Sequence, residues 1–169
     1  VFRVGGEEFA VVFADLTGYT RLTEEIGDEQ AVSTVERFVA SVSRSLPDDA
    51  RVIKTLGDEV MVVGSDAATL TDWAVDFQAG LSAGDPAPRI GIHYGETLYR
   101  DGDYYGREVN IASRVAARSA GGEVLVTRPV VESMERRAPH LEFERIADVK
   151  LKGFRESTEI FIARQGAQA

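Results

Sequence analysis

Apolar residues recur along the chain with two different periods, and segments of the two kinds alternate. Glu8–Asp15 is a short apolar run that ends in a carboxylate, and it predicts a buried strand. Asp28–Leu46 has the three- and four-residue apolar spacing of an amphipathic helix, which Pro47 ends. Two β-branched runs, Arg51–Leu56 and Val60–Val63, are broken by a Gly-Asp pair and predict a hairpin.

The remaining patterns predict more helices and strands in alternation. The expected helices cover Thr17–Ile26, Ala67–Leu81, Glu108–Ala120 and Pro129–Arg137, and the expected strands cover Arg89–Tyr94, Gly95–Tyr99, Glu123–Val126, Leu141–Ile146 and Thr158–Ala163. Because two hairpins interrupt the alternation, the predicted fold is of the α/β class in its α+β sandwich form. We expect a mixed, mainly antiparallel sheet flanked by helices.

Composition limits the classes of protein that fit. With 169 residues, 44% of them hydrophobic, the chain suits one domain spanning residues 1–169. The net charge of −9 excludes a typical nucleic-acid surface. It also means that an anionic nucleotide would need local Lys and Arg side chains and a divalent cation. The lack of cysteine excludes disulfides and thiolate metal sites.

Nothing in the sequence predicts direct contact with a membrane. No apolar run approaches the roughly 20 residues of a bilayer span, and no signal segment opens the chain. A reducing cytoplasm is compatible with the absence of cysteine, and a cytoplasmic location is our expectation. The chain begins at Val1 and not at Met, which is compatible with regulatory domains or an anchor outside this segment.

Two acidic segments are candidates for metal chemistry. Phe13–Thr20 places Asp15 where a buried strand ends, before a turn that leads into a helix. A carboxylate there can hold a hard cation, and the N–H groups of a helix start can bind phosphate oxygens, although a capping Asp is the commoner case. In Lys54–Glu59, the acidic turn is either an ordinary solvated turn or brings Asp58 beside Asp15, so that two carboxylates share two metal ions.

Two further segments carry amide and basic side chains. In Asp103–Arg114, Asn110 and Arg114 are four positions apart on a predicted helix and project from one face. An amide beside a guanidinium suits an oxygen-rich ligand with phosphate charge, whereas the alternative is a surface helix whose arginine pairs with a carboxylate. Asparagine is a poor interior helix former, which favours the functional interpretation. Lys150–Gly153 is by itself only a basic turn.

Together, the segments FADLTGYT, KTLGDE, PRIGIHYG, DYYGREVNIASR and LKG resemble, in order and spacing, the class III adenylyl/guanylyl cyclase catalytic domain. The resemblance runs from Glu8 to Ala163 and is closest in kind to bacterial, actinobacterial members. It implies a ferredoxin-like, palm-like fold. It also implies that the substrate is ATP, which is converted to cyclic AMP and pyrophosphate.

The resemblance assigns metal and triphosphate roles to the first half of the chain. Asp15 and Asp58 match the two metal-binding aspartates, and Leu16 matches a residue whose carbonyl binds metal. Two Mg²⁺ or Mn²⁺ ions per site are implied. The backbone that embraces the triphosphate would be that of Leu16, Thr17, Gly18 and Tyr19.

The resemblance also assigns the residues that bind the base, the ribose and the phosphates. Lys54 and Asp103 match the pair that reads adenine, where a guanine-reading site would carry an acid and a small Cys or Ser. Asn110 matches the amide that orients the ribose, and Arg114 the guanidinium that stabilises the transition state. The groups that hold the terminal phosphates are Arg89 and Lys152, with Lys150 as the alternative to the latter.

In this family the site forms between two copies of the domain, so the resemblance implies a homodimer with two equivalent sites. One copy would contribute Asp15, Asp58 and Arg89. The other would contribute the remaining side chains, which are Lys54, Asp103, Asn110, Arg114 and Lys152.

Two rival functions fit parts of the sequence. Gly5–Phe9 spells the signature loop of diguanylate cyclases, but only four residues precede it, so the metal aspartate expected upstream is missing. We interpret it as a loop that leads into the first strand. The other rival is a silent cyclase homology domain that serves dimerisation or nucleotide sensing, but none of the metal and transition-state residues is missing. His93 and His140 are expected to have structural roles.

Overall fold

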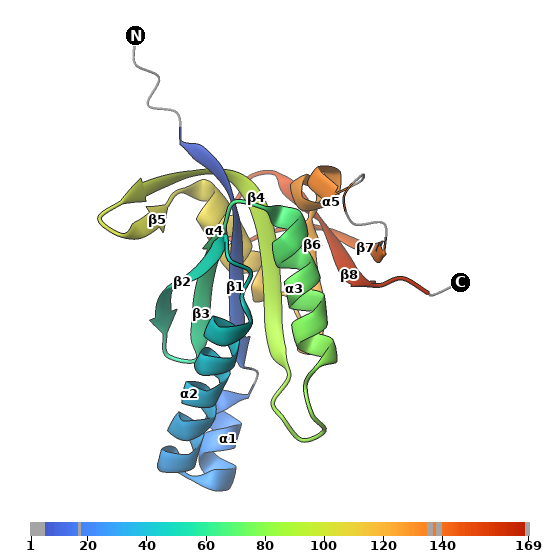
Figure 1. Cartoon of the computed structure of the whole chain (residues 1–169). Coiled ribbons are helices and arrows are strands. Elements are labelled where there is room, and N and C mark those ends of the chain that lie inside the picture. The colour runs from blue at the N-terminus through green and yellow to red at the C-terminus, as the bar shows by residue number, and fades with distance from the viewer. Residues whose placement is uncertain (1–5, 17, 135–136, 138–139, 168–169) are drawn as a thin grey trace.

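The computed structural model describes residues 6–16, 18–134, 137 and 140–167 (Figure 1). The strands are β1 (Glu7–Leu16), β2 (Ala50–Leu56), β3 (Glu59–Gly64), β4 (Pro88–Arg100), β5 (Asp103–Tyr105), β6 (Val124–Thr127), β7 (Leu141–Lys150) and β8 (Ser157–Gln165). The helices are α1 (Tyr19–Ile26), α2 (Asp28–Ser45), α3 (Ala67–Ala79), α4 (Arg107–Ala116) and α5 (Arg128–Met134). No helix among the described residues is long and apolar enough to cross a membrane.

The strands form one mixed sheet, which confirms the predicted fold class. Seven of them follow the order β2-β3-β1-β4-β6-β8-β7, and β5 pairs with the far end of β4. The pair β4–β6 is parallel, and the other pairs are antiparallel. Strand β1 therefore lies between the β2–β3 hairpin and the long strand β4, in the middle of the sheet.

The predicted and observed elements differ in several of their bounds, and β7, for example, runs on to Lys150 where the prediction ended at Ile146. The two segments predicted around Gly95 form one continuous strand, because Gly95 keeps its pairing with Phe9 of β1. Strand β5 was not predicted. Helix α4 ends at Ala116, four residues earlier than predicted, and glycines with positive φ follow at 121 and 122. Helix α5 ends at Met134 and Arg137 lies in a turn, so the predicted helix end at Arg137 is wrong. The predicted cap Thr17 lies outside the described residues.

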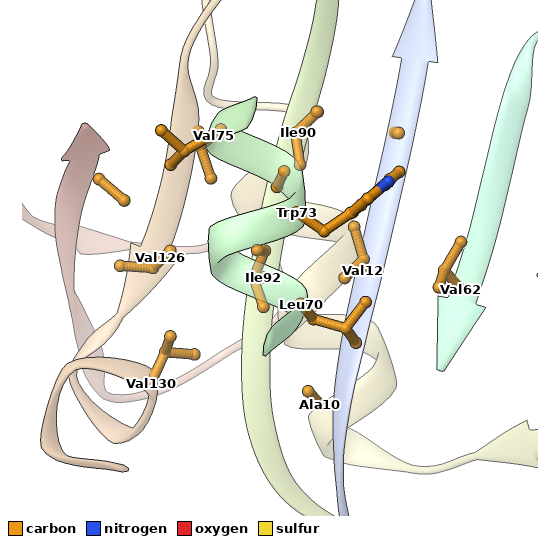
Figure 2. Close-up of a cluster of buried hydrophobic side chains, with 14 of the residues drawn as sticks. Ala10, Val12, Val62, Leu70, Trp73, Val75, Ile90, Ile92, Val126 and Val130 are labelled. Atoms are coloured by element: carbon orange, nitrogen blue, oxygen red, sulfur yellow. The ribbon is translucent and has the colours of Figure 1, made fainter. Parts of the chain in front are cut away.

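Helices cover the two faces of the sheet, with α3 on one face and α4 on the other (Figure 1). Leu70 and Trp73 of α3 pack over Val12 and Ile92, as Figure 2 shows, and belong to the largest buried cluster. On the opposite face, the buried side of α4 packs against β1 and β3. Because side chains alternate along a strand, β1 contributes its even-numbered residues to the first face and its odd-numbered residues to the second.

Helix α4 approaches β4 unusually closely. A Cβ atom added to Gly91 would lie 2.3 Å from the backbone nitrogen of Ala116. A Cβ atom added to Gly95 would lie 2.9 Å from a carboxylate oxygen of Glu108. Two glycines, four positions apart on the same face of the strand, thus make room for the two ends of the helix.

The described part of the rival signature Gly5–Phe9 forms no hairpin of its own. Glu7, Glu8 and Phe9 are the first residues of β1, and all three pair with β4. These three residues therefore belong to a central strand and not to the loop that we expected.

We predict that Gly91→Ala lowers the free energy of unfolding by about 3 kcal/mol, because the added methyl group meets backbone and not a movable side chain. Urea denaturation would measure it. The matched control is Gly84→Ala, where a Cβ atom would meet nothing within 4 Å. Its positive φ alone should cost about 1 kcal/mol. Equal losses in the two variants would contradict the close approach of α4.

Candidate active site

An acidic cluster lies at one end of the three central strands. Asp15 is near the end of β1 and is paired in register with Glu59 of β3 on one side and with Arg89 of β4 on the other. Asp58 is in the turn before β3, where Gly57 has a φ of 63°. The sheet thus brings Asp15 and Asp58 to the same end of the sheet, together with Arg89.

Arg89 neutralises Asp15 directly. Its Nε and Nη2 atoms donate to the two carboxylate oxygens of Asp15 at 2.7 and 2.6 Å. Asp15 is 8% exposed, so this bidentate pair is poorly solvated and strong. The hydrogen bond from Arg89 to Asp15 raises the pKa of the guanidinium above its usual value.

The other two acids of the cluster carry charge that is less well compensated. Burial raises the pKa of the Asp58 carboxyl, and the negative charge of Asp15 adds to this effect. Burial also raises the pKa of Glu59, and the charges of Asp15 and Asp58 add to it. The cluster therefore favours an additional positive charge.

The donor set fits a hard divalent cation. Carboxylates and backbone carbonyls are the ligands that Mg²⁺ and Mn²⁺ prefer, and Asp15, Asp58 and the carbonyl of Leu16 are the candidates here. Within the described ranges, no group of three or more His, Cys, Asp or Glu side chains is placed to hold a metal ion alone. Phosphate oxygens of a substrate would complete such a site, which is usual for Mg²⁺.

The candidate triphosphate loop follows at once. Gly18 precedes α1 with a φ of 71°, a conformation that suits glycine, and its carbonyl accepts from the N–H of Leu22. Tyr19 begins the helix, and Leu16 ends β1 with a buried side chain. Thr17, predicted to contribute backbone to the same loop, lies outside the described residues. The structure thus places Leu16, Gly18 and Tyr19 directly after the acidic cluster.

Lys54 and Asp103 come from different hairpins and meet in an ion pair. The Nζ atom of Lys54 in β2 lies 2.8 Å from Oδ2 of Asp103 in β5. The hydrogen bond from Lys54 holds the pKa of the Asp103 carboxyl below its usual value, and the N–H of Tyr104 also donates to it. The two side chains remain 35% and 22% exposed, so a planar ligand can reach both.

Asn110, Arg114 and Lys152 line one hollow of about 620 Å³. Asn110 and Arg114 are exposed on α4, whose opposite face buries Ile111 and Val115. Lys152 lies in the loop between β7 and β8. Lys150, the alternative, ends β7 and is not among the residues that line the hollow.

The structure does not support the surface-helix alternative for α4. Arg114 makes no ion pair with any carboxylate in the described part of the chain. The hollow is also lined by Arg107, Gly153 and Phe154, for which the sequence alone indicated no role. Three cationic side chains around one hollow favour an anionic ligand.

The predicted site residues therefore form three preassembled groups: the acidic cluster with Arg89, the Lys54–Asp103 pair, and the hollow with Asn110, Arg114 and Lys152. No hydrogen bond or ion pair among the described residues joins the acidic cluster to either of the other two groups. Glu59 was missed as a member of the cluster. Its place opposite Asp15 depends on the register of β1 against β3, which the hairpin pattern alone does not fix.

Comparisons with known proteins identify the family of the chain. The family model of the adenylate and guanylate cyclase catalytic domain matches residues 5–165, and the chain belongs to this family, the class III cyclases. It is 36% identical over 137 residues to an adenylate cyclase of Streptomyces griseus, which covers 79% of this chain and 34% of that protein. It is 33% identical over 167 residues to a pH-sensitive adenylate cyclase of Mycobacterium tuberculosis, which covers 96% and 42%.

The chain thus spans about a third to two fifths of the length of these curated relatives. Among solved structures, the adenylyl cyclase CyaB from P. aeruginosa superposes with a TM-score of 0.74 at 23% identity over 96% of each chain. The catalytic core of a rhodopsin-guanylyl cyclase gives 0.79 at 17% identity over 95% of this chain and 97% of that one. These similarities show that the fold is that of class III cyclases.

We predict that Glu59→Gln raises the melting temperature at pH 7.5. The pKa of Glu59 is higher in the folded protein than in the unfolded chain, so the folded wild type is most stable while this carboxyl is protonated. That stability is lost as pH rises through the folded-state pKa, and at pH 7.5 the ionised carboxylate destabilises the fold. The difference should vanish near pH 4, where the unfolded chain also protonates the group. Glu132→Gln, on α5, controls for lost net charge. A variant less stable than wild type at pH 7.5 would contradict the prediction.

Proposed function

We propose that this chain is the catalytic domain of an adenylyl cyclase, and that it forms ATP-converting sites shared between two copies of itself. The observation that carries the proposal is that Asn110, Arg114 and Lys152, from a helix and a distant loop, line one hollow. The family membership and the names of the relatives support the same activity.

The reaction is an intramolecular phosphoryl transfer. The ribose 3′-oxygen forms a bond to the α-phosphorus and gives up its proton to water or to the departing pyrophosphate. The bond from that phosphorus to the bridging oxygen breaks, and pyrophosphate leaves. The protein has little covalent chemistry to perform, so positioning and charge stabilisation account for the rate. Two divalent cations, held by Asp15, Asp58 and the Leu16 carbonyl, would lower the pKa of the 3′-hydroxyl and balance the charge of the phosphates.

The side chains of the hollow stabilise charge that develops during the transfer. Asn110 orients the ribose, and Arg114, four positions further along the exposed face of α4, faces the α-phosphoryl oxygens. Lys152 and Arg89 neutralise the departing pyrophosphate. Such fixed donors need no reorganisation at the moment of reaction, which is their advantage over water.

The separation of the groups supports a shared site. The acidic cluster lies at the β1 end, whereas Asn110, Arg114 and Lys152 face a hollow between α4 and the β7–β8 loop. In a symmetric pair, the cluster of one copy would face the hollow and the Lys54–Asp103 pair of the other, and two equivalent sites would result. The whole described chain then acts as one catalytic domain.

We predict that the purified protein converts ATP to cyclic AMP and pyrophosphate with Mn²⁺, and that ATP exceeds GTP in kcat/KM by about 100-fold or more. The hydrogen-bond donors and acceptors of guanine do not match this pair of side chains, so Lys54 or Asp103 would lack a partner on the base. Nucleotide separation by chromatography would measure both products. The double variant Lys54→Glu, Asp103→Ser should shift the preference toward GTP. Equal turnover of the two nucleotides by the wild type would overturn the base assignment, and cyclic di-GMP from GTP would overturn the class.

Complementation tests the shared site. We predict that Asp15→Ala and Arg114→Ala are each inactive, and that an equimolar mixture recovers about a quarter of wild-type activity. Half of the randomly assorted dimers are then mixed, and each has one intact site of two. The control mixture is Asp15→Ala with Asp58→Ala, which damages the same half and should recover nothing. Mixed dimers that form but remain inactive would contradict the arrangement.

A further inference from the structure

His93 is a buried polar residue in the face of β4 that α4 covers. It lies between Gly91 and Gly95, the two glycines that make room for the helix, and it is 4% exposed. Its Nδ1 atom lies 2.6 Å from Oγ1 of Thr127 in β6, and its Nε2 atom contacts a carboxylate oxygen of Glu108 in α4. One imidazole thus joins two strands and a helix.

The hydrogen-bond network defines the form of this imidazole. Burial favours the neutral form of the ring, because it lowers the pKa of His93 against the opposing effect of the Glu108 carboxylate. Thr127 is fully buried, and its hydroxyl can donate to Nδ1. The proton then resides on Nε2, which donates to Glu108. This fixes both the tautomer and the orientation of the ring.

Glu108 extends the network toward the hollow. Its second carboxylate oxygen accepts from Nη1 of Arg107 at 3.2 Å. The guanidinium carbon of Arg107 lies 5.4 Å from the ring centroid of Phe154, a cation–π distance. Phe154 is two residues beyond Lys152, and its N–H donates to the carbonyl of Leu151, which closes the turn that carries the lysine.

We propose that His93, Glu108, Arg107 and Phe154 form a positioning chain that holds α4 and the Lys152 loop in a fixed relation, and so sets Asn110 and Arg114 against Lys152. The catalytic roles of Asn110, Arg114 and Lys152 rest on the proposed function, whereas the contacts of the positioning chain do not. Arg107 and Phe154 also line the hollow, whereas His93 and Glu108 do not. As members of the positioning chain, none of the four is assigned a contact with the reacting atoms. They are positioning residues, and they act through α4 and the loop.

Two features indicate positioning and not mere packing. An apolar pair of similar volume would fill the same space without the desolvation that a buried His–Glu contact costs. The strand also lacks a side chain at the place where the carboxylate lies, since a Cβ at Gly95 would be 2.9 Å from its oxygen. Directional contacts fix an angle, which packing does less well, and small displacements of catalytic groups are costly.

Steady-state kinetics with ATP and Mn²⁺ test the role in the reaction. Glu108→Ala should lower kcat roughly tenfold or more and leave KM within about threefold, because the groups displaced act on the transition state. Glu108→Gln, whose amide oxygen still accepts from His93 but whose amide nitrogen cannot accept from Arg107, should also lower kcat, because it cuts the positioning chain at Arg107.

Glu144→Ala is the matched control, since Glu144 also pairs with an arginine but lies on the exposed face of β7. It should leave kcat unchanged. If Glu108→Ala lowers only the melting temperature and leaves kcat of the folded protein intact, the residue is structural and the proposal is overturned. A Glu108→Gln variant with wild-type kcat would overturn it as well.

Hydrogen exchange tests the positioning chain independently of catalysis. In Glu108→Ala, the amides of α4 and those of residues 151–154 should lose protection together, whereas Glu108→Gln should lose protection at residues 151–154 and keep it in α4. Unchanged protection of residues 151–154 would overturn the chain of contacts, whatever the enzyme activity. A wild type that makes no cyclic AMP would instead overturn the proposed function, and hydrogen exchange would still support or overturn the positioning chain.

Discussion

The close contact of α4 with β4 is the constraint on which the arrangement of the site depends. At Gly91 the helix backbone lies where a side chain would otherwise be, so α4 has little freedom to slide or tilt. The same strand begins with Pro88 and Arg89 and pairs with β1 at Asp15. One strand therefore sets the position of the acidic cluster and that of the helix that carries Asn110, although the two groups do not touch.

Much of the fold could be predicted because its patterns are local. The apolar run ending at Asp15, the β2–β3 hairpin with its Gly-Asp turn, and the stripe of α2 each define their element without knowledge of the rest. The same holds for Asn110 and Arg114, because four residues on a helix are enough to place them on one face. The family membership predicted from the five segments is confirmed.

What the sequence did not predict depends on distances between elements. Strand β5 has only three residues and is stable only because β4 runs on past Gly95 to pair with it. The position of Glu59 opposite Asp15 and the contact of His93 with Glu108 both require the register of strands and the approach of a helix. The assignments of individual site residues remain predictions, which the proposed variants test.

The bidentate pair of Arg89 with Asp15 has a consequence for the supply of metal. Because the guanidinium pairs with both oxygens of the carboxylate, the charge of Asp15 is compensated before any divalent cation binds. Each of those oxygens keeps a second lone pair, so under the proposed function a cation that arrives with its nucleotide could bind Asp15 beside the guanidinium or in its place. Without such a cation, the domain keeps this charge paired.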